Sequence, residues 1–191
     1  MKSFFGGSSV QTNHNWGAFP EANLIDSAFG TVGAFPLEQS SLDAAMLQPH
    51  QSGLNSVHIT DSASGIALGE IYTQPEFDGT LLNLSCRTLA GDGNAKVIGG
   101  FVLGGDRPER LLIRAVGPEL ANYGVTAAMS NPRVEIFSSE TMITSNSRWA
   151  VGSGETRMKS YFDLTGAFPL TSGSTDAGLV IDLEPGAYTA V

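Results

Sequence analysis

The pentapeptide "GAFPL" at residues 33–37 is repeated letter for letter at residues 166–170. The copies stand 133 positions apart, and the two tryptophans of the chain, Trp16 and Trp149, are separated by the same distance. The same offset superimposes other identical residues of the flanks, namely Asn13 on Asn146, Ser27 on Ser160, Phe29 on Phe162, Ser41 on Ser174, Asp43 on Asp176 and Gly53 on Gly186. These matches predict an internal repeat whose period has the size of a domain.

The repeat predicts two units of unequal length. Residues 1–72 correspond to the C-terminal half of one unit, residues 73–80 to a linker with Pro75 and Gly79, and residues 81–191 to a second unit. The stretch "ITDSASGIALGEIY" (residues 59–72) has no counterpart in the second unit, which is therefore expected to lack its last strand or strands. Two explanations are open: a window from a longer tandem array, or strand exchange in which residues 1–72 complete the second unit.

The composition is typical of an extracellular β-rich protein. A net charge of −9, with 15% charged residues, provides no basic surface for nucleic acid. The 23 glycines are expected where many turns join short strands. No apolar run has the roughly 18 residues of a membrane-spanning helix. The first ten residues also lack the apolar core of a signal peptide.

Short apolar or alternating runs bounded by Gly, Pro, Asp or Asn predict strands. They occupy residues 81–87, 96–103, 109–116, 133–137, 141–145, 176–183 and 187–191. Together they predict an all-β fold, an antiparallel β-sandwich repeat with one or two short helical turns. A short helix is expected at residues 21–29, where Ile25 and Phe29 stand four apart as Met158 and Phe162 do in the second copy, and a second turn is expected after Pro118. "GDGN" at residues 91–94 lacks the further ligands of a calcium loop and is expected to form a tight hairpin or bulge.

Five stretches carry a resemblance to a known family. They are "LLNLSCRTLAGDGNAKVIGGFVLGG", "RLLIRAVGPELANYGV", "NSRW", "GAFPLTSGSTDAGLVIDLEPGAYTAV" and "GIALGEIY". Together they resemble a repeat domain of very large secreted or surface bacterial proteins that are rich in immunoglobulin-like and other β-sandwich modules. The resemblance implies a secreted or cell-surface location and neighbouring repeat units as partners. It brings no catalytic residues with it.

The tryptophans and one arginine are the candidates for binding. Trp16 and Trp149 each precede a loop, where an indole can stack on a sugar, but a large core residue is the commoner role and the one we expect. Arg114 ends an apolar strand just before a Gly-Pro turn, where a partly buried guanidinium can tie loops together through carbonyl oxygens.

The repeated loop residues are expected to be structural. Phe35 and Phe168 are interpreted as plugs that pin the loop, with Pro36 and Pro169 holding the preceding residue extended. Asp43 and Asp176 precede apolar runs, where an aspartate usually makes a turn or backbone hydrogen bond. Cys86 is the single cysteine and is expected to be a small buried side chain.

The pattern favours a non-enzymatic protein. There is no G-x-S-x-G motif, the three histidines are not repeated, and no second acid recurs at the offset to pair with the aspartates. We therefore expect no catalytic residue, cofactor or metal, and a structural or adhesion module that presents loops from a sandwich, with surface glycans or proteins as further partners. The alternative is a glycan-binding accessory module of a large secreted protein or hydrolase.

Overall fold

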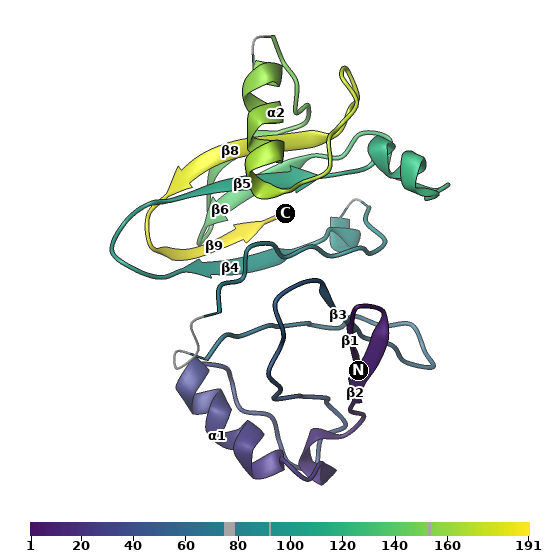
Figure 1. Ribbon diagram of the computed structural model, residues 1–191, viewed down its shortest axis with the longest axis vertical. Helices are drawn as coiled ribbons and strands as arrows, with labels where there is room; N and C mark the ends of the chain where they lie inside the picture. Colours follow the sequence, from purple (N-terminus) through teal and green to yellow (C-terminus); the bar gives the residue numbers. More distant parts are fainter. Residues whose placement is uncertain (75–78, 92, 153) are drawn as a thin grey trace. The chain divides into compact units, whose positions relative to one another are not determined.

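The computed structural model describes residues 1–74, 79–91, 93–152 and 154–191. It contains two compact units, Met1–Leu81 (unit 1) and Leu82–Val191 (unit 2). The division falls at the end of the predicted linker, of which residues 75–78 lie outside the described residues. The described chain is mostly β, with nine strands in three antiparallel sheets and few helices (Figure 1). None of the described helices is long and apolar enough to cross a membrane.

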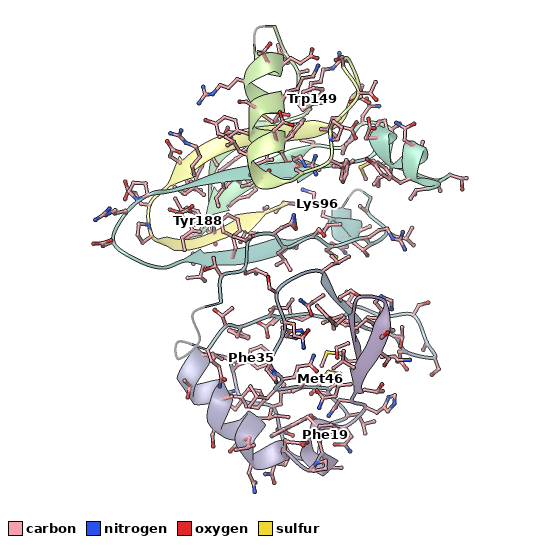
Figure 2. The ribbon with its side chains drawn as sticks, viewed as in Figure 1. Phe19, Phe35, Met46, Lys96, Trp149 and Tyr188 are labelled. Atoms are coloured by element: carbon pink, nitrogen blue, oxygen red, sulfur yellow. The ribbon has the colours of Figure 1, made fainter. Side chains whose placement is uncertain are left out.

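Unit 2 is built in layers. A four-stranded sheet has the order β4 (Gly99–Leu103), β9 (Gly186–Ala190), β6 (Val134–Ser138) and β7 (Thr141–Asn146), and a two-stranded sheet pairs β5 (Glu109–Ala115) with β8 (Ala177–Leu183). Side chains from both sheets share one apolar cluster around Ile136, which is fully buried. Helix α2 (Gly154–Thr165) lies over β5 and β8 and forms a second cluster with Trp149 (Figures 1 and 2).

The sequence of β5 explains its central place. Leu111 and Ile113 belong to the cluster between the sheets, whereas Leu112 and Val116 belong to the cluster beneath α2. Successive side chains of a strand point to opposite faces, so a strand covered on both faces needs a continuous apolar run. The apolar residues "LLI" (111–113) and "AV" (115–116), on either side of Arg114, supply both faces, and β5 accordingly lies between the two clusters of unit 2.

Unit 1 is smaller. Its sheet has the order β2 (Ser8–Thr12), β1 (Lys2–Phe5) and β3 (Asn55–His58), and helix α1 spans Ala22–Val32. Among the residues of unit 1 that the structure describes, the buried large apolar ones are Trp16, in a 3-10 turn over Trp16–Ala18, and Ile25 of α1.

The strand pairings of unit 1 match pairings among β6, β7 and β9 of unit 2. Adding 133 to the residue numbers of most pairs in unit 1 gives a pair in unit 2. Ser3 pairs with Val57 as Ile136 pairs with Ala190. The hairpins β1–β2 and β6–β7 each contain a register shift, between Ser3 and Phe4 in one and between Ile136 and Phe137 in the other. β1, β2 and β3 are thus the equivalents of β6, β7 and β9.

"GAFPL" ends a helix in both units. Gly33 and Gly166 have left-handed φ angles of 72° and 68°. The amide that follows each glycine donates to the carbonyl oxygen of the phenylalanine five residues earlier, at 2.9 Å in both units. This is the usual glycine stop of an α-helix. The two helices span 11 and 12 residues and are therefore longer than the short helical turns expected.

Several predicted strands are absent. Residues 81–87 and 59–72 form no strand, and the strand expected at 96–103 begins only at Gly99. A strand is stable only when a partner completes its backbone hydrogen bonds, and no described segment pairs with these residues. Cys86 is exposed, contrary to the prediction, because a segment outside a sheet has no buried face. At "GDGN", Gly93–Ala95 form a 3-10 turn in place of the expected hairpin, and Asp92 lies outside the described residues.

Candidate functional site

The sequence-predicted residues of unit 2 meet at the end of β5. We call this place the β5 corner, defined by Arg114, Glu119, Tyr123, Phe168 and Asp176. Two segments meet there: the turn after β5, with a 3-10 helix over Pro118–Tyr123 that ends at Gly124, and the loop that begins with "GAFPL". The predicted helical turn after Pro118 is therefore confirmed.

Arg114 makes the type of contact predicted for it. Its Nη1 donates to the carbonyl oxygen of Phe168 at 2.6 Å. Its guanidinium lies 4.3 Å from the centre of the Phe168 ring and 5.2 Å from that of Phe162. Burial lowers the pKa of Arg114, while the nearby Tyr123 and Asp176 oppose this shift. The side chain thereby fixes the "GAFPL" loop to β5 through the hydrogen bond and the Phe168 ring, and it contacts α2 through the Phe162 ring.

Asp176 ties three parts of unit 2 together. Its side chain is fully buried, and Oδ1 accepts from the amides of Gly117, at 2.7 Å, and Glu119, at 3.4 Å. Oδ2 accepts from Ser174 Oγ at 2.7 Å, and Ser174 Oγ in turn accepts from Trp149 Nε1 at 3.0 Å. The backbone hydrogen bonds predicted for Asp176 are therefore present, and they hold the start of the 3-10 helix.

Asp43, which stands 133 positions before Asp176, has different surroundings. Its carboxylate is exposed, although its carbonyl oxygen accepts from the Trp16 amide at 3.0 Å, as that of Asp176 accepts from the Trp149 amide at 2.9 Å. The backbone contact is thus common to both units, and the carboxylate contacts belong to unit 2.

Glu119 is a buried, hydrogen-bonded acid that was not predicted from the sequence. It is 7% exposed; Oε1 accepts from Asn122 Nδ2 at 2.8 Å, and Oε2 accepts from the Thr171 amide at 2.7 Å. These hydrogen bonds lower the pKa of Glu119, that from Asn122 having the largest effect. The available signal was an acid in the first turn after Pro118, a position at which a carboxylate faces free amides.

Gly117 is required by close packing. A Cβ atom at this position would lie 2.1 Å from the carbonyl oxygen of Met129. The glycine thus lets the turn after β5 approach this second backbone segment while its amide reaches Asp176.

The tryptophans occupy the interior. Trp16 is fully buried and Trp149 is 3% exposed, with ring centres 5.4 Å from Phe29 and from Phe162, respectively. Trp16 Nε1 donates to the Glu38 carbonyl oxygen at 3.1 Å. Neither indole presents a face on which a sugar could stack, so the core role is the one that their burial supports.

The two phenylalanines of "GAFPL" behave differently. Phe168 lies half-buried against Arg114 and Tyr123, with a ring-centre distance of 5.0 Å to the latter, and holds its loop as expected. Phe35 is 54% exposed, so the interpretation as a plug is wrong for this copy. Unit 1 has no equivalent of β5 among its described strands and hence no arginine to hold the ring. Pro36 and Pro169 are exposed in both copies.

A chain of polar side chains crosses unit 1. Ser3 Oγ donates to Gln48 Oε1 at 3.3 Å, Gln48 Nε2 lies 3.1 Å from His50 Nε2, and His50 Nδ1 lies 2.8 Å from Asn55 Oδ1. A pocket of about 110 Å³ lies beside it, lined by Phe5, Val10, Pro49, His50, Gln51 and Asn55. The pocket contains none of the predicted binding residues. Within the described residues, no three His, Cys, Asp or Glu side chains are grouped closely enough to hold a metal ion.

The β5 corner is arranged for holding backbone. Both oxygens of each buried carboxylate accept hydrogen bonds, most of them from amides, and the arginine donates to a carbonyl oxygen. A catalytic acid or base needs an oxygen directed at a substrate, and these groups are directed at the chain itself. The chain matches no protein-family model, no curated protein and no solved structure.

Proposed function

We propose that this protein is a non-catalytic structural module, a β-sandwich repeat whose units present surface loops for adhesion. The observation that carries the proposal is the set of contacts common to both units. The hairpin register shift, the helix stop and the tryptophan-to-aspartate backbone bond all recur at the same offset.

Two further observations support a scaffold. The cluster shared by the four-stranded and two-stranded sheets of unit 2 is the arrangement expected of a sandwich core. The buried charges of the β5 corner fix loops to strands, which keeps a rigid framework beneath exposed loops. Together with the resemblance to repeat domains of large bacterial surface proteins, they favour a secreted or cell-surface location and neighbouring units as partners.

The test is an unfolding experiment on the intact chain. If each unit is a separate scaffold element, Trp149→Ala removes the unfolding transition of unit 2 and leaves that of unit 1, and Trp16→Ala does the reverse. Each substitution deletes a buried aromatic side chain, for which a loss of about 3–5 kcal/mol is typical. Urea titration followed by residue-resolved NMR measures both transitions. Loss of both folds after either substitution would contradict the proposal.

Glycan binding is the function that competes with this proposal. The burial of both indoles removes the two side chains that the sequence suggested for stacking on a sugar. A glycan array with the intact chain is expected to give no saturable binding. A reproducible hit that survives competition by unrelated sugars would replace the scaffold proposal with a glycan-binding one.

A further inference from the structure

Arg110 and Asp182 stand directly opposite each other on β5 and β8. Arg110 Nε donates to Asp182 Oδ1 at 2.5 Å, and Nη2 donates to Oδ2 at 2.6 Å. Two residues further along the strands, Leu112 and Val180 form a pair on the same face and pack in the cluster beneath α2. The ion pair therefore lies on the helix side of the two strands, where both charged side chains are about half exposed.

Helix α2, which lies over β5 and β8, brings two more side chains to this pair (Figure 1). Arg157 and Tyr161 are one helical turn apart and therefore share one face of the helix. Arg110 Nη1 donates to the Tyr161 hydroxyl oxygen at 3.3 Å, and the guanidinium of Arg157 lies 5.8 Å from the centre of the Tyr161 ring. We call these four residues, Arg110, Arg157, Tyr161 and Asp182, the Tyr161 cluster. Two guanidinium groups against one carboxylate leave an excess of positive charge in it.

The two arginines favour the ionised form of Tyr161. A hydrogen bond from Arg157 has the largest effect in lowering the pKa of the phenol, and the charge and hydrogen bond of Arg110 lower it as well. Partial removal of water opposes this shift. A tyrosine oxygen reacts as a nucleophile in its ionised form, so both guanidinium groups make the oxygen of Tyr161 more reactive.

The Tyr161 cluster is not part of the repeat. At the positions 133 residues before its members on α2 and β8, the chain has neither a charged side chain nor a hydroxyl; these positions hold Leu24, Ala28 and Pro49. The glycine stop of the helix and the tryptophan-to-aspartate backbone bond are nevertheless common to both units. The features that the two units share are therefore formed without such a cluster, which is a property of unit 2 alone.

We propose that Tyr161 is a nucleophilic tyrosine and a site of covalent modification by sulfonyl and sulfuryl electrophiles. The phenolate oxygen attacks the sulfur atom, a bond between oxygen and sulfur forms, and the bond from sulfur to its leaving group breaks. The leaving group departs with the electron pair of that bond, and the phenolic proton passes to water. Arg157 is exposed and donates to the oxygens on sulfur, where negative charge increases during the attack. The proposal is independent of the scaffold function, because the Tyr161 cluster lies outside the repeat.

The probe is para-fluorosulfonylbenzoate, added to the intact chain at neutral pH, with fluoride as the leaving group. Its carboxylate suits the excess of positive charge in the Tyr161 cluster. Peptide mapping by mass spectrometry measures the labelling rate of each of the four tyrosines of the chain. We expect Tyr161 to be labelled at least about fivefold faster than any other tyrosine.

The other tyrosines provide internal controls. Tyr123 is 58% exposed whereas Tyr161 is half-buried, so accessibility alone favours Tyr123. The Tyr72 hydroxyl donates to Glu70 Oε1 at 3.0 Å, and this hydrogen bond raises the pKa of Tyr72, which is therefore expected to react most slowly. Labelling of Tyr123 at the rate of Tyr161 or faster would overturn the proposal.

Substitutions test the role of the charges. Arg157→Gln is expected to slow the labelling of Tyr161 at least about threefold, and Arg157→Lys, which keeps the charge, to slow it less. The matched control is Arg148→Gln, at an exposed arginine that is not among the groups lowering the pKa of Tyr161; it is expected to leave the rate unchanged. Asp182→Asn is expected to act in the opposite direction and to raise the rate, because it releases Arg110 from its ion pair.

These substitutions are at exposed positions and are expected to leave the fold intact, which urea unfolding of each variant checks. An unchanged labelling rate of Tyr161 in Arg157→Gln would contradict the proposal. Slower labelling in a folded Asp182→Asn variant would contradict it as well, because it would show that the ion pair positions Tyr161 and does not restrain its reactivity.

Discussion

At the scale of single residues, Asp176 and Asp43 form a natural comparison. The two aspartates occupy equivalent positions, and one is buried with both oxygens bonded while the other is exposed. A buried acceptor that serves backbone amides contributes to stability because its removal leaves those amides without water or protein partners. An exposed carboxylate leaves nothing unsatisfied when it is removed.

We therefore expect Asp176→Ala to destabilise unit 2 by about 1–3 kcal/mol. Its matched control, Asp43→Ala, is expected to change the stability of unit 1 by less than about 0.5 kcal/mol. Urea unfolding of the intact chain measures both. Equal losses from the two substitutions would show that burial of the carboxylate is not what distinguishes them.

Glu119 makes the stability of unit 2 depend on pH. Its pKa is below the usual 4.5, so the ionised form stabilises the fold above that value, and the stabilisation is lost as the pH falls through the lowered pKa. Glu119→Gln is expected to flatten the fall in unfolding free energy between about pH 5 and pH 3. The remaining slope comes in part from Glu155 and Asp182, whose pKa values are also lowered. Urea midpoints at several pH values test this; an unchanged slope excludes Glu119 as a cause.

At the scale of elements, the sequence predicted strands where a partner strand exists and failed where none does. The runs at 109–116, 133–137, 141–145 and 176–183 each contain most of a strand. "LLNLSCR" alternates equally well, yet Leu82 and Leu84 are 90% and 64% exposed. Alternation reports the capacity of a segment to form a strand, whereas pairing depends on a second segment that periodicity does not identify.

The sequence likewise predicted some residues of the β5 corner and failed to predict others. Arg114 was identified from its place before a Gly-Pro turn, and Asp176 from its place before an apolar run. Glu119 was missed because its partners, Asn122 and the Thr171 amide, come from segments that only the fold brings together. Phe35 was misjudged because the repeat suggested equal surroundings for two identical pentapeptides.

The glycine that ends α2, Gly166, gives a prediction at the scale of elements. Gly166 has a φ of 68° and open space around its Cα, so an alanine there meets no clash and the cost comes from the left-handed backbone alone. Gly166→Ala is expected to destabilise unit 2 by about 1–2 kcal/mol, with fraying of the last turn of α2. Chemical shifts of residues 161–166 and the urea midpoint measure the two effects. The control Gly154→Ala, at the start of α2, has neither a left-handed φ nor a close neighbour and is expected to be neutral or stabilising.

At the scale of the whole molecule, the two units differ in how much apolar surface they bury. Unit 2 has one apolar cluster between its sheets and another beneath α2. In unit 1 the position of Ile136 is occupied by Ser3 and that of Leu183 by His50, and a chain of polar contacts takes the place of the first cluster. Unit 2 is accordingly expected to carry most of the stability of the chain, because buried apolar area is the main source of stability.

The pairing of β4 with β9 has a mechanical consequence. These are the first and last strands of unit 2, and Gly99, where β4 begins, lies opposite Ala190, where β9 ends. In the array of neighbouring units that we propose, tension would pull on these two neighbouring points in opposite directions. The hydrogen bonds between the strands would then break one after another and would never be loaded all together. Such a unit would yield at low force and release about 110 residues of chain, each adding roughly 3.6 Å when extended. An array of these units would be an extensible tether, in contrast to a stiff rod.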